Sequence, residues 1–278
     1  MLKKFKYQLR YDIQTGTFLA WKEFLFLVFV TLLIILTIYN NIHSKAILFG
    51  KEISWIDYLS GFFMGMKEYS ADERNLSFNI PIPWLIIQIG YYLIIARYPR
   101  MDLKERGYQF IIRSGGKKIW WYSKCIWICI HTVIYYGIVY GTTLVVAAVT
   151  GDLHLWNTKD VWGLGVNILT PGQLILVLFI MPIIIAIALG ILEMLISFLC
   201  NPLIAVIGML TICVASAYWY SPFLPGNYIM LIRNRWLFPQ YHTRMLYGIL
   251  YSVVIGTVSA VIGYYYFCRQ DIYEKGVE

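Results

Sequence analysis

Long apolar segments alternate with short polar segments along most of this chain. A helix needs about 20 predominantly apolar residues to span a membrane. By that measure the pattern predicts six spans, at about 18–40, 80–97, 120–150, 172–199, 202–220 and 245–268. The fourth and fifth spans share one apolar stretch, which Asn201 and Pro202 divide because proline disfavours a helical conformation at the residue before it.

The pattern also predicts three helices that do not cross. At 1–17, apolar residues recur at helical spacing while lysine and arginine occupy the other faces, which is typical of a helix lying flat on a membrane surface. Residues 55–66 follow the template of an amphipathic helix packed against the membrane or the other spans. Residues 103–113 read as a short helix that Ser114, Gly115 and Gly116 terminate.

The composition explains where such a chain can fold. Apolar residues make up 59% of it, charged residues only 14%, and the mean hydropathy is +0.64. Soluble domains average about 45–50% apolar and about 25% charged residues, so this excess cannot be buried in one water-soluble core. We therefore expect an all-α membrane protein with a single transmembrane domain over 1–278, and neither a soluble enzyme nor a disordered regulator.

The charge pattern predicts the orientation. Of the 23 lysines and arginines, fifteen lie in the segments on the side of the N-terminus and eight on the other side. Cytoplasmic loops carry the basic excess, so both termini are expected in the cytoplasm. We expect a multi-pass protein of a bacterial plasma membrane. The net charge of +8 arises beside apolar spans, which favours a membrane surface over nucleic acid as the partner.

Motifs for chemistry are absent from the sequence. There is no GxxxxGK[ST] loop for nucleotide phosphates, no HExxH and no GxSxG, and the four histidines are scattered. The five cysteines fall in or beside apolar segments, where we expect them to act as small packing residues. The sequence thus predicts no catalytic residue and no metal site, and any ATP must be hydrolysed by another chain.

Glu193 is the one acidic residue well inside an apolar span. An ionisable group in lipid is costly and by default marks a polar path or a paired site, which makes Glu193 a candidate for a translocation path. The alternative is structural, because Glu193 lies about two helical turns from the end of its span and could reach headgroups or water.

The topology, together with two local segments, resembles the permease subunit of the type-two ATP-binding-cassette exporters. Residues 108–124, YQFIIRSGGKKIWWYSK, are similar to the coupling-helix segment that leads into the third span of that family. Residues 266–272, YFCRQDI, are similar to its closing segment. The resemblance implies a pair of permeases, identical or different, each with a cytosolic ATPase docked under its coupling helix.

The resemblance also assigns roles to residues. The candidate ATPase contacts are Lys104, Arg106, Tyr108, Phe110 and Arg113. The candidate anchors of the third span at the inner interface are Trp120, Trp121 and Lys124. On this interpretation the chain binds no cofactor, and ATP and Mg²⁺ belong to the partner subunit.

Two functions from different classes fit these features. The first is a permease that moves an amphipathic or apolar cargo outward, a peptide or a lipid-like molecule, because the aromatic-rich spans carry little charge. The second is a membrane scaffold, sensor or immunity protein on the same fold that transports nothing and uses the helix at 55–66 as its partner surface.

Overall fold

The computed structural model describes the chain except residues 1, 51, 70–79, 115, 155–159 and 270–278, together with the side chains of 105, 106, 108, 113 and 114. Across the described residues the chain folds into helices, turns and loops without a β-strand. The α-helices in chain order are α1 (Leu2–Leu19), α2 (Trp21–Phe49), α3 (Trp55–Phe63), α4 (Ile82–Asp102), α5 (Tyr108–Ser114), α6 (Lys117–Thr150), α7 (Pro171–Ile175), α8 (Met181–Leu199), α9 (Pro202–Tyr218) and α10 (Met245–Arg269).

Shorter helical turns connect several of these helices. The π-helical turns are η1 (Leu103–Gly107), between α4 and α5, and η3 (Leu176–Ile180), between α7 and α8. The 3₁₀ turns are η2 (Val166–Ile168), η4 (Pro225–Tyr228) and η5 (Leu231–Arg233).

Within the described part of the chain, four helical segments are long and apolar enough to cross a membrane: Trp21–Phe49, Lys117–Thr150, Pro171–Leu199 and Met245–Arg269. The chain is therefore an all-helical membrane protein, as its sequence predicts. Pro202–Tyr218 is apolar but shorter. Helix α4, with 21 residues, is not among the four, and it carries Arg97, Arg100 and Asp102 near its end.

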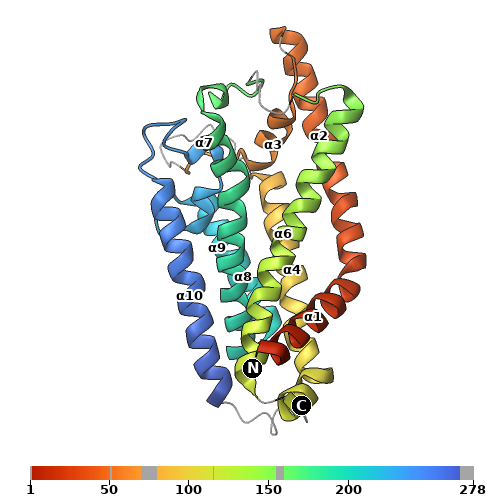
Figure 1. The fold of residues 1–278 in the computed structure, drawn as a ribbon. Helices are drawn as coiled ribbons and strands as arrows, with labels where there is room; N and C mark the ends of the chain where they lie inside the picture. Colours follow the sequence, from red (N-terminus) through yellow and green to blue (C-terminus); the bar gives the residue numbers. More distant parts are fainter. Residues whose placement is uncertain (1, 51, 70–79, 115, 155–159, 270–278) are drawn as a thin grey trace.

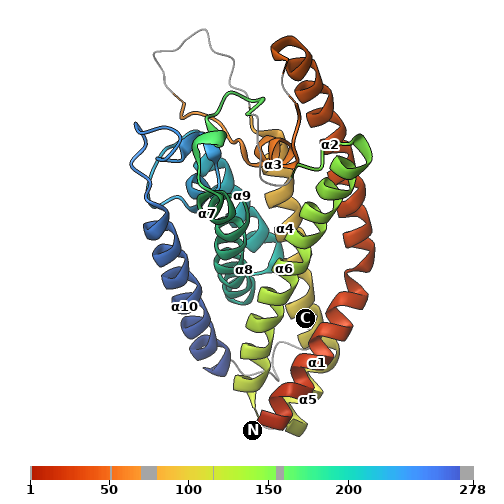
Figure 2. The same cartoon turned by 45° about the horizontal axis from the view of Figure 1, so that its top comes forward.

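The long helices run side by side, and α1 crosses them at one end (Figure 1). The start of α1 and the end of α10 lie at this same end, which we call the α1 end. Helix α5 also lies there, close to α1, as Figure 2 shows. At the opposite end are α3 and the turns between α9 and α10.

Two helix boundaries differ from the sequence prediction. Helix α2 continues past 40 to Phe49, where Gly50 adopts the left-handed conformation that commonly ends a helix. In this extension, the rings of Tyr39 and His43 stack at 5.3 Å and the Lys45 ammonium lies 4.6 Å from the Trp162 ring. The short helix predicted at 103–113 is not an isolated element. It consists of the π-helical turn η1 and helix α5, and η1 continues directly from the end of α4.

Aromatic side chains pack α6, α8 and α10 together near the α1 end. The ring of Trp120 lies 4.9 Å from that of Phe267, and Trp121 lies 5.6 Å from Phe198. Gly263 permits this approach, because a Cβ atom at that position would lie 2.1 Å from a ring carbon of Trp121. Nε1 of Trp121 donates to the carbonyl of Ala260 at 2.9 Å.

At the opposite end of the bundle, the side chain of Arg233 connects several segments through hydrogen bonds. Its buried guanidinium donates to the carbonyls of Ser216, Ala217 and Trp219, which are at the C-terminal end of α9. These are the carbonyls that a helix end leaves without intrahelical partners. The guanidinium satisfies them, and its positive charge interacts favourably with the negative end of the helix dipole. The same side chain donates to the carbonyl of Met66 at 2.9 Å and so connects α9 to the segment after α3.

The helix predicted within 55–66 is present as α3, and it packs against the rest of the chain. All of its residues except Gly61 are buried. Nε1 of Trp55 donates to Thr143 on α6 at 2.9 Å, and Nε1 of Trp162 donates to the carbonyl of Asp57 at 2.8 Å. Because α3 is covered by the rest of the chain, it does not offer the exposed partner surface expected of a scaffold.

Candidate functional site

Three charged side chains from three helices meet inside the α1 end. Nζ of Lys124 on α6 lies 2.7 Å from Oδ1 of Asp12 on α1 and 2.6 Å from Oδ2 of Asp102 at the end of α4. The side chains of Lys124 and Asp12 are 0% exposed, and that of Asp102 is 1% exposed. We call Asp12, Asp102 and Lys124 the ionic cluster.

Polar and aromatic neighbours complete the ionic cluster. Asp12 accepts hydrogen bonds from Gln8 at 2.8 Å, from Ser123 at 2.5 Å and from the Tyr98 hydroxyl at 3.1 Å. Nε1 of Trp120 donates to Oδ2 of Asp102 at 3.0 Å. The Lys124 ammonium lies 4.2 Å from the ring of Tyr98, within the range of a cation–π contact.

The ionic cluster holds two carboxylates and one ammonium, a formal charge of −1. Burial raises the pKa of the Asp12 carboxyl above its ordinary value, and its contacts with Lys124 and Ser123 act in the opposite direction. A buried charge is costly unless it is paired. Separation of α1 or α4 from α6 would leave the carboxylate of Asp12 or Asp102 without the Lys124 ammonium. The ionic cluster therefore ties α1 and the end of α4 to α6.

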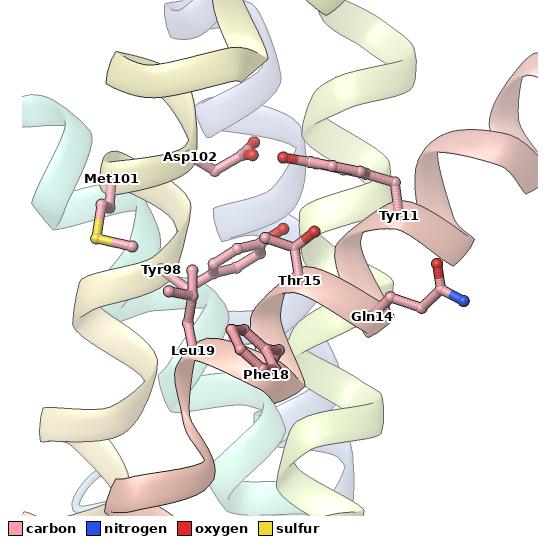
Figure 3. A pocket seen from close by; sticks show the side chains of 8 residues that line it. All are labelled: Tyr11, Gln14, Thr15, Phe18, Leu19, Tyr98, Met101 and Asp102. Atoms are coloured by element: carbon pink, nitrogen blue, oxygen red, sulfur yellow. The ribbon is translucent and has the colours of Figure 1, made fainter.

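A pocket opens between α1 and α4 next to the ionic cluster (Figure 3). Its volume is about 410 Å³. The lining residues are Tyr11, Gln14, Thr15, Phe18, Leu19, Tyr98, Met101 and Asp102. In Figure 3 the Asp102 carboxylate and the Tyr11 hydroxyl point toward each other, whereas Phe18 and Leu19 lie at the far side of the pocket.

Helix α5 and the preceding turn η1 carry the residues that the family resemblance assigned to ATPase docking. Lys104, just before it in η1, is exposed. Phe110 is half-buried and packs against the core, so it supports α5 from within. The side chains of Arg106, Tyr108 and Arg113 lie outside the described part of the chain, and the docking role of all five residues stays a prediction.

The sequence analysis missed a more accessible apolar residue on α5. Ile112 is 58% exposed, whereas its neighbour Ile111 packs against the core. The helical spacing of the apolar residues could not tell which of them faces inward. Ile112 therefore joins the candidate docking residues.

The three predicted interface anchors lie inside the bundle. Trp120, Trp121 and Lys124 are each 0% exposed. The sequence placed them at the headgroups because aromatic and basic residues gather there. The structure places Lys124 in the ionic cluster and the two tryptophans among the aromatic side chains of α8 and α10, so they position the start of α6 through protein contacts. Their role as anchors at the inner interface stays a prediction.

Glu193 on α8 is fully buried, and neither carboxylate oxygen has a hydrogen-bond partner among the described residues. Its side chain therefore does not reach the protein surface, and a structural role inside the bundle stays open beside the role in a path. Its role in a translocation path stays a prediction.

The described residues contain no group of three or more His, Cys, Asp or Glu side chains that could hold a metal ion. The segment 266–272 is described only as far as Arg269, where α10 ends. Comparison with protein-family models, with curated proteins and with solved structures finds no match to this chain. Its function has to be argued from its own geometry.

Proposed function

We propose that this chain is the membrane-spanning permease subunit of an ATP-driven exporter of the type-two ATP-binding-cassette class. It works with a second permease copy, identical or different, and with a cytosolic ATPase subunit that binds ATP and Mg²⁺. The cargo is amphipathic or apolar, and a short peptide fits the aromatic-rich spans best. The chain itself carries no hydrolytic residue in this proposal.

The proposal requires six crossings with both termini in the cytoplasm. Two helices, α4 and α9, would add to the four clear candidates. At 1.5 Å per residue, the 21 residues of α4 extend over about 31 Å and the 17 residues of α9 over about 26 Å. Both values are near the thickness of about 30 Å of a bilayer core. The common location of the start of α1 and the end of α10 supports an even number of crossings.

The observation that carries the proposal is the connection from α5 into the bundle. Helix α5 lies at the α1 end and continues from α4 through η1. The last residue of α4, Asp102, is ion-paired with Lys124 on α6, and Lys124 is ion-paired with Asp12 on α1. A force applied to α5 by a docked ATPase would therefore reach three helices through buried contacts.

The scaffold alternative receives less support. It relied on the outer helix as a partner surface, and α3 is buried against the rest of the chain. We therefore retain transport as the single proposal.

Substitution of Ile112 tests the docking step. Ile112→Asp places a charge on the exposed apolar face of α5, and we expect the amount of ATPase subunit that co-purifies with the tagged chain to fall by at least about tenfold. Burying an unpaired carboxylate in an interface is costly enough for such a loss. The measurement is quantitative mass spectrometry of the chains captured from native membranes.

Leu153→Asp is the matched control, since Leu153 is 49% exposed and follows α6 at the opposite end of the bundle. It should leave co-purification unchanged. The docking claim fails if no nucleotide-binding chain is captured with the unaltered protein, or if both substitutions reduce capture equally.

A further inference from the structure

The pocket between α1 and α4 has a feature that the proposed function does not use. Oδ2 of Asp102 is ion-paired with Nζ of Lys124 at 2.6 Å and accepts a hydrogen bond from Nε1 of Trp120 at 3.0 Å. No described residue donates to Oδ1 of the same carboxylate. Asp12, in contrast, has four donors. The acceptor capacity left in the ionic cluster therefore lies on the residue that lines the pocket.

Charge indicates what the pocket would accept. The ionic cluster carries one more carboxylate than ammonium, so a cation in the pocket would bring it to neutrality. The side chain of Tyr11 also lines the pocket beside Asp102, and an aromatic ring can contact such a cation. An anionic group would instead meet the Asp102 carboxylate in a cluster whose formal charge is already −1.

The other side of the pocket is apolar and open. Phe18 is 75% exposed and Leu19 is 37% exposed. Trp21, at the start of the adjoining α2, is 48% exposed. Exposed apolar and aromatic residues at the end of an amphipathic helix are typical of the boundary between headgroups and acyl chains. A ligand in this pocket therefore meets a carboxylate at one end and lipid-facing side chains at the other.

We propose that this pocket binds a phospholipid through a primary ammonium headgroup, such as that of phosphatidylethanolamine, with the ammonium donating to Asp102. The acyl chains leave past Phe18 and Leu19. A volume of about 410 Å³ suits a headgroup, since ligand pockets commonly measure about 300–1,000 Å³. The bound lipid would fix α1 against α4. This inference does not depend on transport or on an ATPase.

The test compares two lipids that differ at the headgroup nitrogen, where three methyl groups of phosphatidylcholine replace the three N–H donors of phosphatidylethanolamine. The full chain is delipidated in detergent and titrated with dioctanoyl phosphatidylethanolamine or dioctanoyl phosphatidylcholine, and bound lipid is counted by native mass spectrometry. Both headgroups are zwitterions with a positively charged nitrogen, but only the nitrogen of phosphatidylethanolamine can donate hydrogen bonds to a carboxylate. A charge-assisted hydrogen bond of ordinary strength predicts a dissociation constant about tenfold lower for phosphatidylethanolamine.

Variants locate the binding. Thr15→Trp fills the pocket from α1, and Met101→Trp fills it from α4. If the first variant does not fold, the second provides the same test. Each should abolish the preference for phosphatidylethanolamine. Tyr7→Trp is the control, because Tyr7 lies on α1 outside the pocket and is 70% exposed. This variant should keep the preference for phosphatidylethanolamine. Equal affinity for the two lipids, or a preference that survives both filling variants, would overturn the proposal.

A third titration distinguishes a lipid from a soluble amine. Ethanolamine alone lacks the phosphate and the acyl chains, so it should compete only at concentrations far above those of the lipid. If it displaces phosphatidylethanolamine at equal concentration, the pocket is an amine site without a lipid function, and the proposal is wrong.

Discussion

Replacement of Lys124 by methionine should be among the most destabilising substitutions in this protein. Methionine keeps much of the side-chain volume but removes the ammonium that Asp12 and Asp102 share. Both carboxylates are buried, at 0% and 4% residue exposure, so neither can recover its hydration without opening the α1 end. The variant therefore leaves two like charges unpaired in the interior.

The contacts set the scale of the loss. At an effective dielectric constant of 20, each N–O contact of 2.6–2.7 Å corresponds to a gross attraction of about 6 kcal/mol. Most of this offsets desolvation, and removal of one partner from a buried ion pair typically costs about 3–5 kcal/mol. We expect a decrease of about 4–5 kcal/mol in the free energy of unfolding. The loss should shrink at lower pH, because burial already raises the pKa of Asp12 and protonation removes its unpaired charge.

Unfolding of the purified protein in mixed micelles, with an increasing fraction of a denaturing detergent, measures this difference. The control is Lys118→Met, one turn and a half earlier on α6, because Lys118 is exposed and should change the unfolding free energy by less than about 0.5 kcal/mol. The triple variant Asp12→Asn, Asp102→Asn, Lys124→Met should recover most of the loss. A cost below about 1 kcal/mol for Lys124→Met would refute the role given to the ionic cluster.

Two further substitutions test the packing at either end of the bundle. Arg233→Met should lower the unfolding free energy by about 3 kcal/mol, since it leaves buried carbonyls at the end of α9 unsatisfied, whereas Arg235→Met, at an exposed site, should be nearly neutral in the same assay. Gly263→Ala should cost about 1–3 kcal/mol by displacing Trp121, while Gly137→Ala meets no atom within 4 Å and should stabilise α6 by up to about 1 kcal/mol. Equal effects within either pair would contradict the corresponding packing account.

The sequence predicts the long helices well because apolar length is a local property. The expected spans at 120–150, 172–199 and 245–268 agree with α6, the run from α7 to α8, and α10 within a few residues. The end of α2 is missed because its last turns carry polar residues, and tertiary contacts such as that of Lys45 with Trp162 compensate for this. The η1 connection is missed because no residue pattern distinguishes a π-helical turn from a loop.

The candidate site is largely invisible in the sequence. Asp12 and Lys124 are 112 positions apart, and nothing in either local pattern indicates that they meet. Lys124 belongs to a basic segment, which makes it resemble a headgroup anchor. The exposure of Ile112 likewise depends on which face of α5 packs against the core. Such pairings depend on how helices approach one another, which a hydrophobic pattern alone leaves open.

The central proposal is that this chain is a passive path moved by a separate ATPase. ATP hydrolysis by material captured through a tag on the chain tests this most directly, when measured before and after the associated chains are removed. The account predicts hydrolysis by the captured complex and none by the isolated chain. Hydrolysis by the isolated chain, or a complex with no hydrolytic activity, would contradict it.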